Sequence, residues 1–352
     1  MEPVTHLLTG ACIGRAGLNR RTAYATLMLT LASEFPDVDV LWDFKGPVEA
    51  FAHHRGFTHS FLGAPVDALI VLGFVYAFHR WRQSRGKSPA LPPRWGLLFL
   101  FGILAVLSHI LLDFTNNYGV RPFMPFNWHW YSWDIVFIVE PLMLLVLTVG
   151  LVLPSIFALV GSEIGARKEK FRGRWSAIAA LLAVFAIWWM RDYEHRKAMT
   201  LLDSTDYRGE AVVRVAAMPY PVTPFVWAGI VETPSFYAKI PIDLRSTNND
   251  PQDRAQIFYK PAETPITLAA KRSPLGRAYL DWSRFPLLEA DPLPPPEPGY
   301  EVRLRDLRFD YLPLSPSGRP PRRIPLSASI VVDRNARVVL MRMGNEEEKA
   351  KD

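Results

Sequence analysis

The sequence predicts an all-α polytopic membrane domain of about six helices, the first two short, followed by a small β-rich soluble domain. Hydrophobic residues make up 49% of the 352 residues, but they are unevenly distributed. Residues 1–192 are apolar with short basic interruptions, whereas the residues from 200 onward are polar, charged and rich in proline. We therefore expect a transmembrane domain over 1–192 and a second domain over 200–345.

Four segments of the first domain have the length and apolar composition of transmembrane helices. They cover residues 60–78, 95–113, 134–160 and 174–190. Two further apolar segments, 4–18 and 22–35, are shorter and are separated by Leu-Asn-Arg-Arg. We expect these two to form a tight helical hairpin that the neighbouring helices shield.

Basic residues predict the orientation, because short loops rich in lysine and arginine stay in the cytoplasm. The connections 79–95 and 161–174 and the hinge 15–21 are basic, whereas the opposite loops hold only Lys45, Arg55 and Arg121. All three basic connections lie on the cytoplasmic side of the membrane if the N-terminus is outside and six membrane-inserted segments follow it. This multi-pass arrangement makes the C-terminal domain extracytoplasmic. The N-terminus also lacks the basic region of a cleavable signal.

Short runs of β-branched and aromatic residues between proline-rich turns predict strands in the tail. These runs lie at 210–218, 236–244, 256–260, 301–311 and 326–340. The sequence Asp333-Arg334-Asn335 predicts a hairpin turn within the last run. Residues 346–352 are expected to be frayed.

Composition also excludes several classes of protein. The net charge of +6 is modest and its basic residues lie in short loops, so no nucleic-acid partner is expected. Cys12 is the single cysteine, which excludes an intramolecular disulfide and a cysteine metal site. The chain has neither a Gly-x-Ser-x-Gly elbow nor a glycine-rich phosphate loop.

Two histidine-containing motifs lie at the ends of apolar runs. His-His-Arg-Gly-Phe-Thr-His-Ser occupies 53–60, and Ser-His-Ile-Leu-Leu-Asp occupies 108–113. Ionisable side chains are costly near a membrane unless they serve a function, and histidine is the commonest metal ligand in proteins. A spacing of four places His109 and Asp113 on one helix face. Both motifs therefore predict a metal site.

Further candidate site residues lie near these motifs. Pro36 ends a helix, which leaves the carboxylates of Glu34, Asp37 and Asp39 at the outer boundary of the membrane. The expected metal ligands are His6, Asp37, His59, His109 and Asp113. Asp39 and His54 are expected to be additional or supporting ligands. The candidate catalytic residues are Glu34, as general base or ligand, Arg55 and Thr58. The candidate substrate-binding residues are Arg55, Asn117 and Arg121. Histidine with carboxylate favours zinc, with manganese, iron or nickel as alternatives.

Structural roles are the alternative for several of these residues. Arg55 could pair with Asp37 or Asp39 and bind no substrate, and both aspartates could cap the following turn. Asp67 and Glu140 lie inside apolar runs, where we expect structural hydrogen bonds. A lone histidine at a membrane boundary is usually interfacial, which applies to His54, His79 and His129.

The order of these motifs resembles a known family, the bacterial inner-membrane metal-dependent hydrolases, over roughly residues 1–160. The matching segments are Thr5-His6, Pro36 to Asp39, His54 to Ser60 and His109 to Asp113. The resemblance implies a multi-helix membrane domain and metal-dependent hydrolysis. A more distant similarity to zinc-dependent phospholipase C rests on the His-x-x-x-Asp helix. The later His-x-x-x-Glu element of that family is absent, since Trp133 follows His129 at that spacing, and a three-metal centre is not supported.

The sequence thus predicts a membrane-bound metal-dependent hydrolase that acts at the outer face of the inner membrane. A site at the bilayer boundary favours a lipid or lipid-linked phosphoester or ester, because such substrates present their head groups there. The alternative is a non-catalytic, metal-stabilised membrane protein that acts as an interaction or regulatory module. A metal transporter is disfavoured, since the ionisable residues form no path through the bilayer. The oligomeric state is left open.

Overall fold

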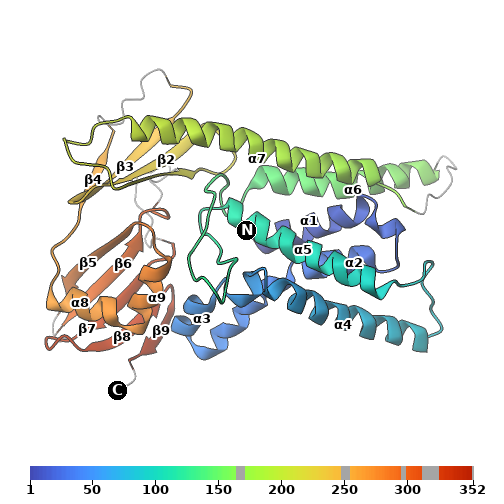
Figure 1. The fold of residues 1–352 in the computed structure, drawn as a ribbon, viewed down its shortest axis with the longest axis horizontal. Helices are drawn as coiled ribbons and strands as arrows, with labels where there is room; N and C mark the ends of the chain where they lie inside the picture. Colours follow the sequence, from blue (N-terminus) through green and yellow to red (C-terminus); the bar gives the residue numbers. More distant parts are fainter. Residues whose placement is uncertain (164–170, 247–253, 295–298, 311–324, 351–352) are drawn as a thin grey trace. The chain divides into compact units, whose positions relative to one another are not determined.

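The computed structural model describes residues 1–163, 171–246, 254–294, 299–310 and 325–350 (Figure 1). The chain divides into two compact units, which we describe separately. The first unit comprises Met1–Asp39, Arg55–Tyr193 and Pro219–Pro224. The second unit comprises Val40–His54, Glu194–Met218 and Phe225–Asp352. The predicted boundary between 192 and 200 falls within one continuous helix that ends at Asp203.

The first unit is helical, and it confirms the predicted class of fold. Its helices are α1 (Pro3–Arg15), α2 (Ala25–Ala32), α4 (Gly63–Ser84), α5 (Trp95–Thr115), α6 (Pro141–Glu163) and α7 (Arg174–Asp203). By length and composition, α5, α6 and α7 could each cross a membrane. A fourth span is possible if Pro47–His59 and α4, which meet at an 85° bend, are counted together. The first two helices are short, as predicted.

Helices α1 and α2 cross closely because α1 carries glycines four residues apart. A Cβ atom on Gly10 would lie 2.4 Å from the carbonyl oxygen of Leu29. A Cβ atom on Gly14 would lie 2.9 Å from the Cα atom of Thr26. Small residues at this spacing let two helix backbones approach each other in membrane proteins. The hairpin predicted from 4–35 is therefore held together by backbone proximity.

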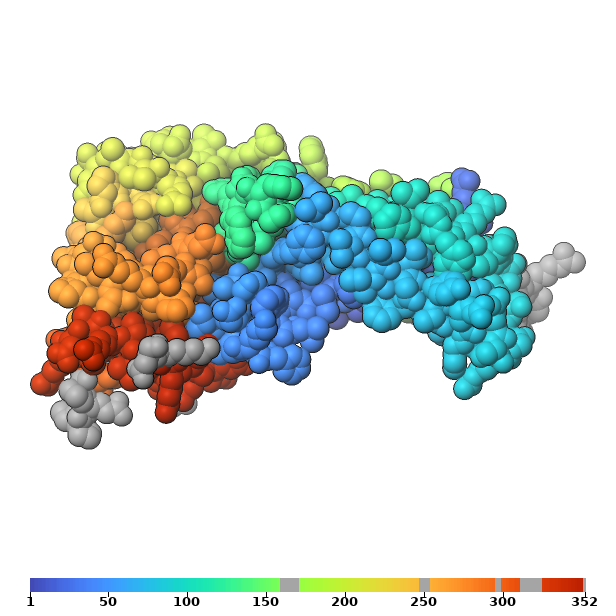
Figure 2. All heavy atoms as spheres, turned by 60° about the horizontal axis from the view of Figure 1, so that its bottom comes forward, coloured from blue at the N-terminus to red at the C-terminus, as the bar shows by residue number. Residues whose placement is uncertain are grey.

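Apolar side chains of the helices form two clusters in the first unit. One joins α2, α4 and α5 and includes Met28, Leu29, Leu98 and Val106. The other joins α1, α5, α6 and α7 and includes Cys12, Leu112, Met143, Leu147 and Val184. Helices α4 and α5 lie side by side in Figure 1, and their outward surfaces form the light-blue to teal region of Figure 2.

The segments between these helices differ from the prediction. Residues 134–140 are not helical, because α6 begins at Pro141, a residue that favours the first helical position. The preceding segment is instead held by isolated bridges, between Asn116 and Val136 and between Val120 and Tyr131. The loop before α4 forms two 3₁₀ segments, η2 (Phe35–Lys45) and η3 (Phe57–His59). These two segments carry the candidate ligands into the first unit.

The second unit contains two sheets, which confirms the predicted β-rich domain. One sheet has the order β1 (Arg214–Pro219), β2 (Val226–Glu232), β3 (Phe236–Asp243) and β4 (Gln256–Tyr259). The other has the order β5 (Pro286–Pro292), β6 (Tyr300–Asp306), β7 (Ala328–Val332), β8 (Val338–Met343) and β9 (Glu346–Lys349). The five-stranded sheet is antiparallel throughout, and the predicted turn at Asp333 joins β7 to β8.

Three helices of the second unit were not predicted, namely α3 (Pro47–His53), α8 (Pro265–Arg272) and α9 (Pro274–Trp282). Phe51 of α3 packs against the rings of Tyr279 and Trp282 of α9, at centroid distances of 5.8 and 5.4 Å. The expectation of frayed residues at 346–352 was wrong for Glu346–Lys349, which pair with β8 as strand β9. Residues 351 and 352 lie outside the described part of the chain.

Candidate metal centre

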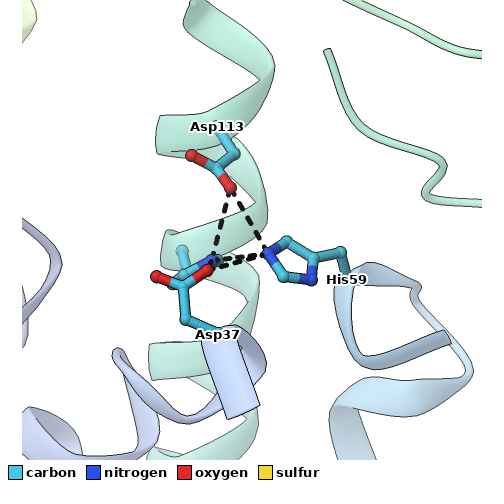
Figure 3. A group of neighbouring side chains, drawn as sticks. Asp37, His59 and Asp113 are labelled. Atoms are coloured by element: carbon cyan, nitrogen blue, oxygen red, sulfur yellow. Dashed lines mark hydrogen bonds and ion pairs between the residues drawn. The ribbon is translucent and has the colours of Figure 1, made fainter. Parts of the chain in front are cut away.

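Four of the predicted ligands converge on one point of the first unit. One nitrogen or oxygen atom from each of Asp37, His59, His109 and Asp113 lies within 4.8 Å of the others. Asp37 comes from η2, His59 from η3, and His109 and Asp113 from adjacent turns of α5. Figure 3 shows the Asp37, His59 and Asp113 side chains pointing toward one another. We call these four residues the metal-ligand cluster.

The distances within the metal-ligand cluster are short enough for a shared cation. The Nε2 atoms of His59 and His109 are 3.0 Å apart. Asp37 Oδ1 lies 3.3 Å from Nε2 of His59 and 3.5 Å from Nε2 of His109, and Asp113 Oδ2 lies 3.4 Å from each. His59, His109 and Asp113 are fully buried, whereas the Asp37 side chain is 26% exposed. Asp37 is therefore the ligand of the cluster that solvent can reach.

Contacts on the far side of each imidazole determine which nitrogen faces the cluster. Nδ1 of His109 lies 2.8 Å from the carbonyl oxygen of Ser33, an acceptor, so this nitrogen carries the proton. Nδ1 of His59 lies 3.2 Å from the hydroxyl of Thr58 and 3.5 Å from Asp39 Oδ2. Protonation at both Nδ1 atoms leaves two bare Nε2 atoms beside two carboxylates. Two bare imidazole nitrogens 3.0 Å apart repel each other unless a cation lies between them, and the donors of this cluster suit a divalent transition metal.

Arg55 supports the cluster through Asp113. Its Nη2 atom donates to Asp113 Oδ1 at 2.9 Å, and its Nη1 atom donates to the Gly119 carbonyl oxygen at 2.9 Å. The guanidinium carbon lies 4.6 Å from the ring centre of Tyr118. Asp39 accepts a hydrogen bond from the backbone N–H of Arg55 at 2.6 Å, so it is not the partner of the guanidinium. The buried side chain of Arg55 thus fixes and neutralises Asp113.

His6 and Glu34 lie at the edge of the cluster. The fully buried ring of His6 stacks on His109 with centroids 3.7 Å apart, and its Nε2 atom is 3.5 Å from Asp113 Oδ1. Neither ring nitrogen of His6 has a hydrogen-bond partner within the described ranges. Burial, followed by the negative charge of Asp37, raises the pKa of Glu34 to about 8. His6 therefore has no fixed hydrogen bond, and Glu34 keeps its proton to a higher pH than an exposed glutamate does.

The remaining predicted site residues occupy different environments. His54 follows α3 and belongs to the second unit, so it is not part of the cluster described above. Asn117 and Arg121 are buried in the segment after α5, where the Arg121 guanidinium carbon lies 4.4 Å from the ring centre of Trp130. The functional roles of all these residues stay predictions. Sequence reasoning missed Ser33, because a backbone carbonyl acceptor leaves no signal in the residue types.

Comparison with known proteins identifies the first unit. The family model described as YdjM inner membrane protein matches residues 1–195 of the 352, a range that includes the whole metal-ligand cluster. The chain belongs to the YdjM inner membrane protein family. This match confirms the predicted inner-membrane family and, together with the apolar helices, an inner membrane protein.

A curated relative provides a second comparison. The chain is 27% identical over 149 residues to the uncharacterized protein YfhP of Bacillus subtilis (strain 168). The aligned region covers 40% of this chain and 42% of the relative, so the chain spans about two fifths of that protein. No solved structure matches the chain. The similarity to phospholipase C is not shown by these comparisons and stays a prediction.

Proposed function

We propose that the protein is a membrane-bound, metal-dependent hydrolase that acts on a lipid or lipid-linked phosphoester or ester at the outer face of the inner membrane. The observation that carries this proposal is the buried metal-ligand cluster, in which two imidazole nitrogens and two carboxylates converge. Solvent access to Asp37 supports a catalytic role, because water and substrate can approach the cluster through this ligand.

The metal-ligand cluster would hold the ion, with zinc as our first choice. When bound, a divalent ion supplies Lewis-acid activation of water and of a phosphoryl or carbonyl oxygen. Ser33 orients His109, whereas Thr58 and Asp39 orient His59. Such contacts fix the ring orientation and raise the basicity of a ligating imidazole.

The other candidate residues would transfer a proton, support a ligand or bind the substrate. Glu34, with a pKa of about 8, is largely protonated at neutral pH, so it can donate a proton to a leaving group and accept one at higher pH. Arg55 acts through Asp113, to which its guanidinium is bonded. Arg121 and Asn117 remain our candidates for binding a phosphoryl group.

The position of the cluster along α5 supports a lipid substrate. Asp113 is two residues from the end of this helix, which is long and apolar enough to span a membrane. A ligand set near the end of a span lies at the depth of lipid head groups and of their ester bonds. A water-soluble substrate would not need a catalytic centre at that depth.

Metal analysis combined with a substrate screen tests the proposal. We compare wild type with His59→Ala and Asp113→Ala, and use His129→Ala, which removes an exposed histidine, as the control. Wild type and the control should contain stoichiometric metal and hydrolyse at least one phospholipid, phosphodiester or ester. The two ligand variants should lose the metal and more than about 100-fold of activity, beyond the loss typical of supporting residues.

Two outcomes would contradict the proposal in different ways. Equally low metal in wild type and in both ligand variants would exclude a metal centre. Metal that depends on His59 and Asp113, without hydrolysis of any substrate in the panel, would favour the non-catalytic, metal-stabilised alternative.

A further inference from the structure

A groove in the first unit shares no lining residue with the metal-ligand cluster and is not explained by hydrolysis. Its volume is about 490 Å³, and its lining includes Arg20, Leu153, Pro154, Phe157, Arg174 and Trp175. These residues come from η1 (Leu18–Arg20), which follows α1, from α6 and from the first turn of α7. The groove therefore joins three segments that are distant in sequence.

The two arginines of the groove bond to backbone carbonyl oxygens. Arg20 Nη2 donates to the carbonyl oxygen of Phe171 at 3.1 Å, and Arg174 Nε donates to that of Ala16 at 3.2 Å. Within the described part of the chain, no carboxylate lies within ion-pair distance of either guanidinium. The carbonyls hold both side chains in place but leave their charge available. Both arginines are exposed.

The other wall of the groove is apolar and equally accessible. Phe157 is 65% exposed and Trp175 is 74% exposed, and Leu153 and Pro154 lie beside them on α6 and complete this wall. Helices α6 and α7 are both candidate membrane spans by length and composition, so their exposed apolar side chains suit contact with lipid. A ligand that matches both walls must combine a negative head with an apolar chain.

We propose that this groove binds an anionic phospholipid, with its phosphodiester between Arg20 and Arg174 and an acyl chain along Leu153 and Phe157. Basic pockets between transmembrane helices are known to accept such head groups. The bound lipid would connect the turn after α1 to α6 and α7. This inference does not depend on the proposed hydrolase activity, because it uses none of the metal-ligand cluster.

Lipid selectivity of the purified full-length protein tests the inference. Native mass spectrometry would measure binding of phosphatidylglycerol and phosphatidylcholine with identical acyl chains to wild type, to Arg20→Gln/Arg174→Gln, and to Arg80→Gln/Arg85→Gln. The last variant is the matched control, since it removes the same charge from exposed positions at the end of α4 that do not line the groove.

Wild type should prefer phosphatidylglycerol, and the control should keep that preference. The groove variant should bind phosphatidylglycerol on the order of 30-fold more weakly, since each arginine near an anionic lipid surface contributes about 1 kcal/mol. Absence of a preference in wild type, or an equal loss in both double variants, would overturn the inference.

Because both arginines also bond to backbone carbonyls, their removal could disturb η1 and α7 as well as lipid binding. A second variant therefore tests the site with both arginines in place. Trp175→Glu puts a carboxylate next to Arg174 in the first turn of α7, where an acidic residue is favourable. Its thermal unfolding should match that of wild type, and its preference for phosphatidylglycerol should disappear. A preference that survives this substitution would contradict the proposed site.

Discussion

Single backbone and side-chain contacts decide how the metal-ligand cluster can function. His59 and His109 present their Nε2 atoms to each other because Thr58, Asp39 and the Ser33 carbonyl occupy the Nδ1 sides. Arg55 similarly determines the orientation of Asp113. The residue types of the cluster were predictable from spacing, but these orienting contacts depend on neighbours that are far apart in the sequence.

Buried ionisable side chains outside the cluster differ in whether they have hydrogen-bond partners. Glu140, expected to make a structural hydrogen bond, accepts one from Arg191 at 2.7 Å and one from the Val222 N–H at 3.2 Å. Asp67 differs, since its Oδ2 atom is buried and has no hydrogen-bond partner among the described residues. In the second unit, Lys239 of β3 is only 2% exposed and lies 4.0 Å from Asp310.

Lys239 should make the stability of the second unit depend on pH. Burial lowers the pKa of Lys239 from 10.5 to about 8, although the charge of Asp310 raises it. Below pH 8 the lysine is charged in both states, so the folded state bears the full cost of burial. Between pH 8 and 10.5 the unfolded state binds more protons, and the free energy of unfolding therefore rises with pH.

Replacement of this lysine should remove that dependence. Lys239→Met is expected to raise the free energy of unfolding near pH 7 by up to roughly 3 kcal/mol, and the gain should vanish above the unfolded pKa. Hydrogen exchange of peptides that cover β3, corrected for intrinsic rates, measures the effect. Lys260→Met is the control, because its ammonium is 29% exposed and pairs with Glu232. An equal gain from both variants would contradict the explanation.

At the scale of elements, the close crossing of α1 and α2 positions the candidate ligands. Helix α1 carries His6, and α2 leads through Ser33 into the η2 segment that carries Asp37. The hydroxyl of Ser33 also donates to the carbonyl oxygen of His6 at 2.9 Å. Any change in the distance between these helices would therefore change the geometry of the cluster.

Gly10→Ala tests this crossing, because the added methyl group would collide with the backbone of Leu29. We expect a loss of about 1–3 kcal/mol in the free energy of unfolding, as for other overpacked sites, together with weaker metal binding. Gly73→Ala is the matched control, since nothing lies within 4 Å of the position of its Cβ atom in α4. Thermal unfolding and metal content measure both effects, and similar behaviour of the two variants would refute the close-packing argument.

The buried pair of Glu140 and Arg191 connects the start of α6 to α7 and to the segment Pro219–Pro224. The Arg191 guanidinium also donates to the Tyr220 carbonyl oxygen at 3.3 Å. Arg191→Met should cost about 3–5 kcal/mol, because it leaves a buried carboxylate without its cation. The double variant Glu140→Gln/Arg191→Met should recover much of this loss in thermal unfolding. Strictly additive effects would show that the two residues do not stabilise each other.

At the scale of the whole molecule, the orientation in the membrane is our remaining prediction. The basic connections after α4 and before α7, and the three arginines of the 15–21 hinge, favour one cytoplasmic side. Six membrane-inserted segments would then place the second unit outside the cytoplasm. Hydrolysis of lipid at the outer face depends on the same orientation.

Reporter fusions measure this orientation directly. Alkaline phosphatase fused after Leu202 should be active, because the enzyme folds only outside the cytoplasm. The same reporter fused after Arg85, in the connection that follows α4, should be inactive. A silent fusion after Leu202 combined with an active fusion after Arg85 would reverse the predicted topology.

Features that depend on local pattern were predictable from the amino-acid sequence. Apolar length predicts the spanning helices, the four-residue spacing of His109 and Asp113 places them on one helix face, and alternating short runs predict several strands. It did not predict α8 and α9, whose eight and nine residues are too short for a clear helical period. Each of these helices begins with a proline, a residue that also marks turns, so the local pattern is ambiguous.

Only the tertiary structure decided which of the candidate ligands meet. His54 and His59 are five residues apart, yet they belong to different units, because Phe51 packs with the aromatic residues of α9. The partner of Arg55 is Asp113, which is distant in sequence, and not the nearer Asp37 or Asp39. Residue types predict what a side chain can bind, but packing over long sequence distances decides what it reaches.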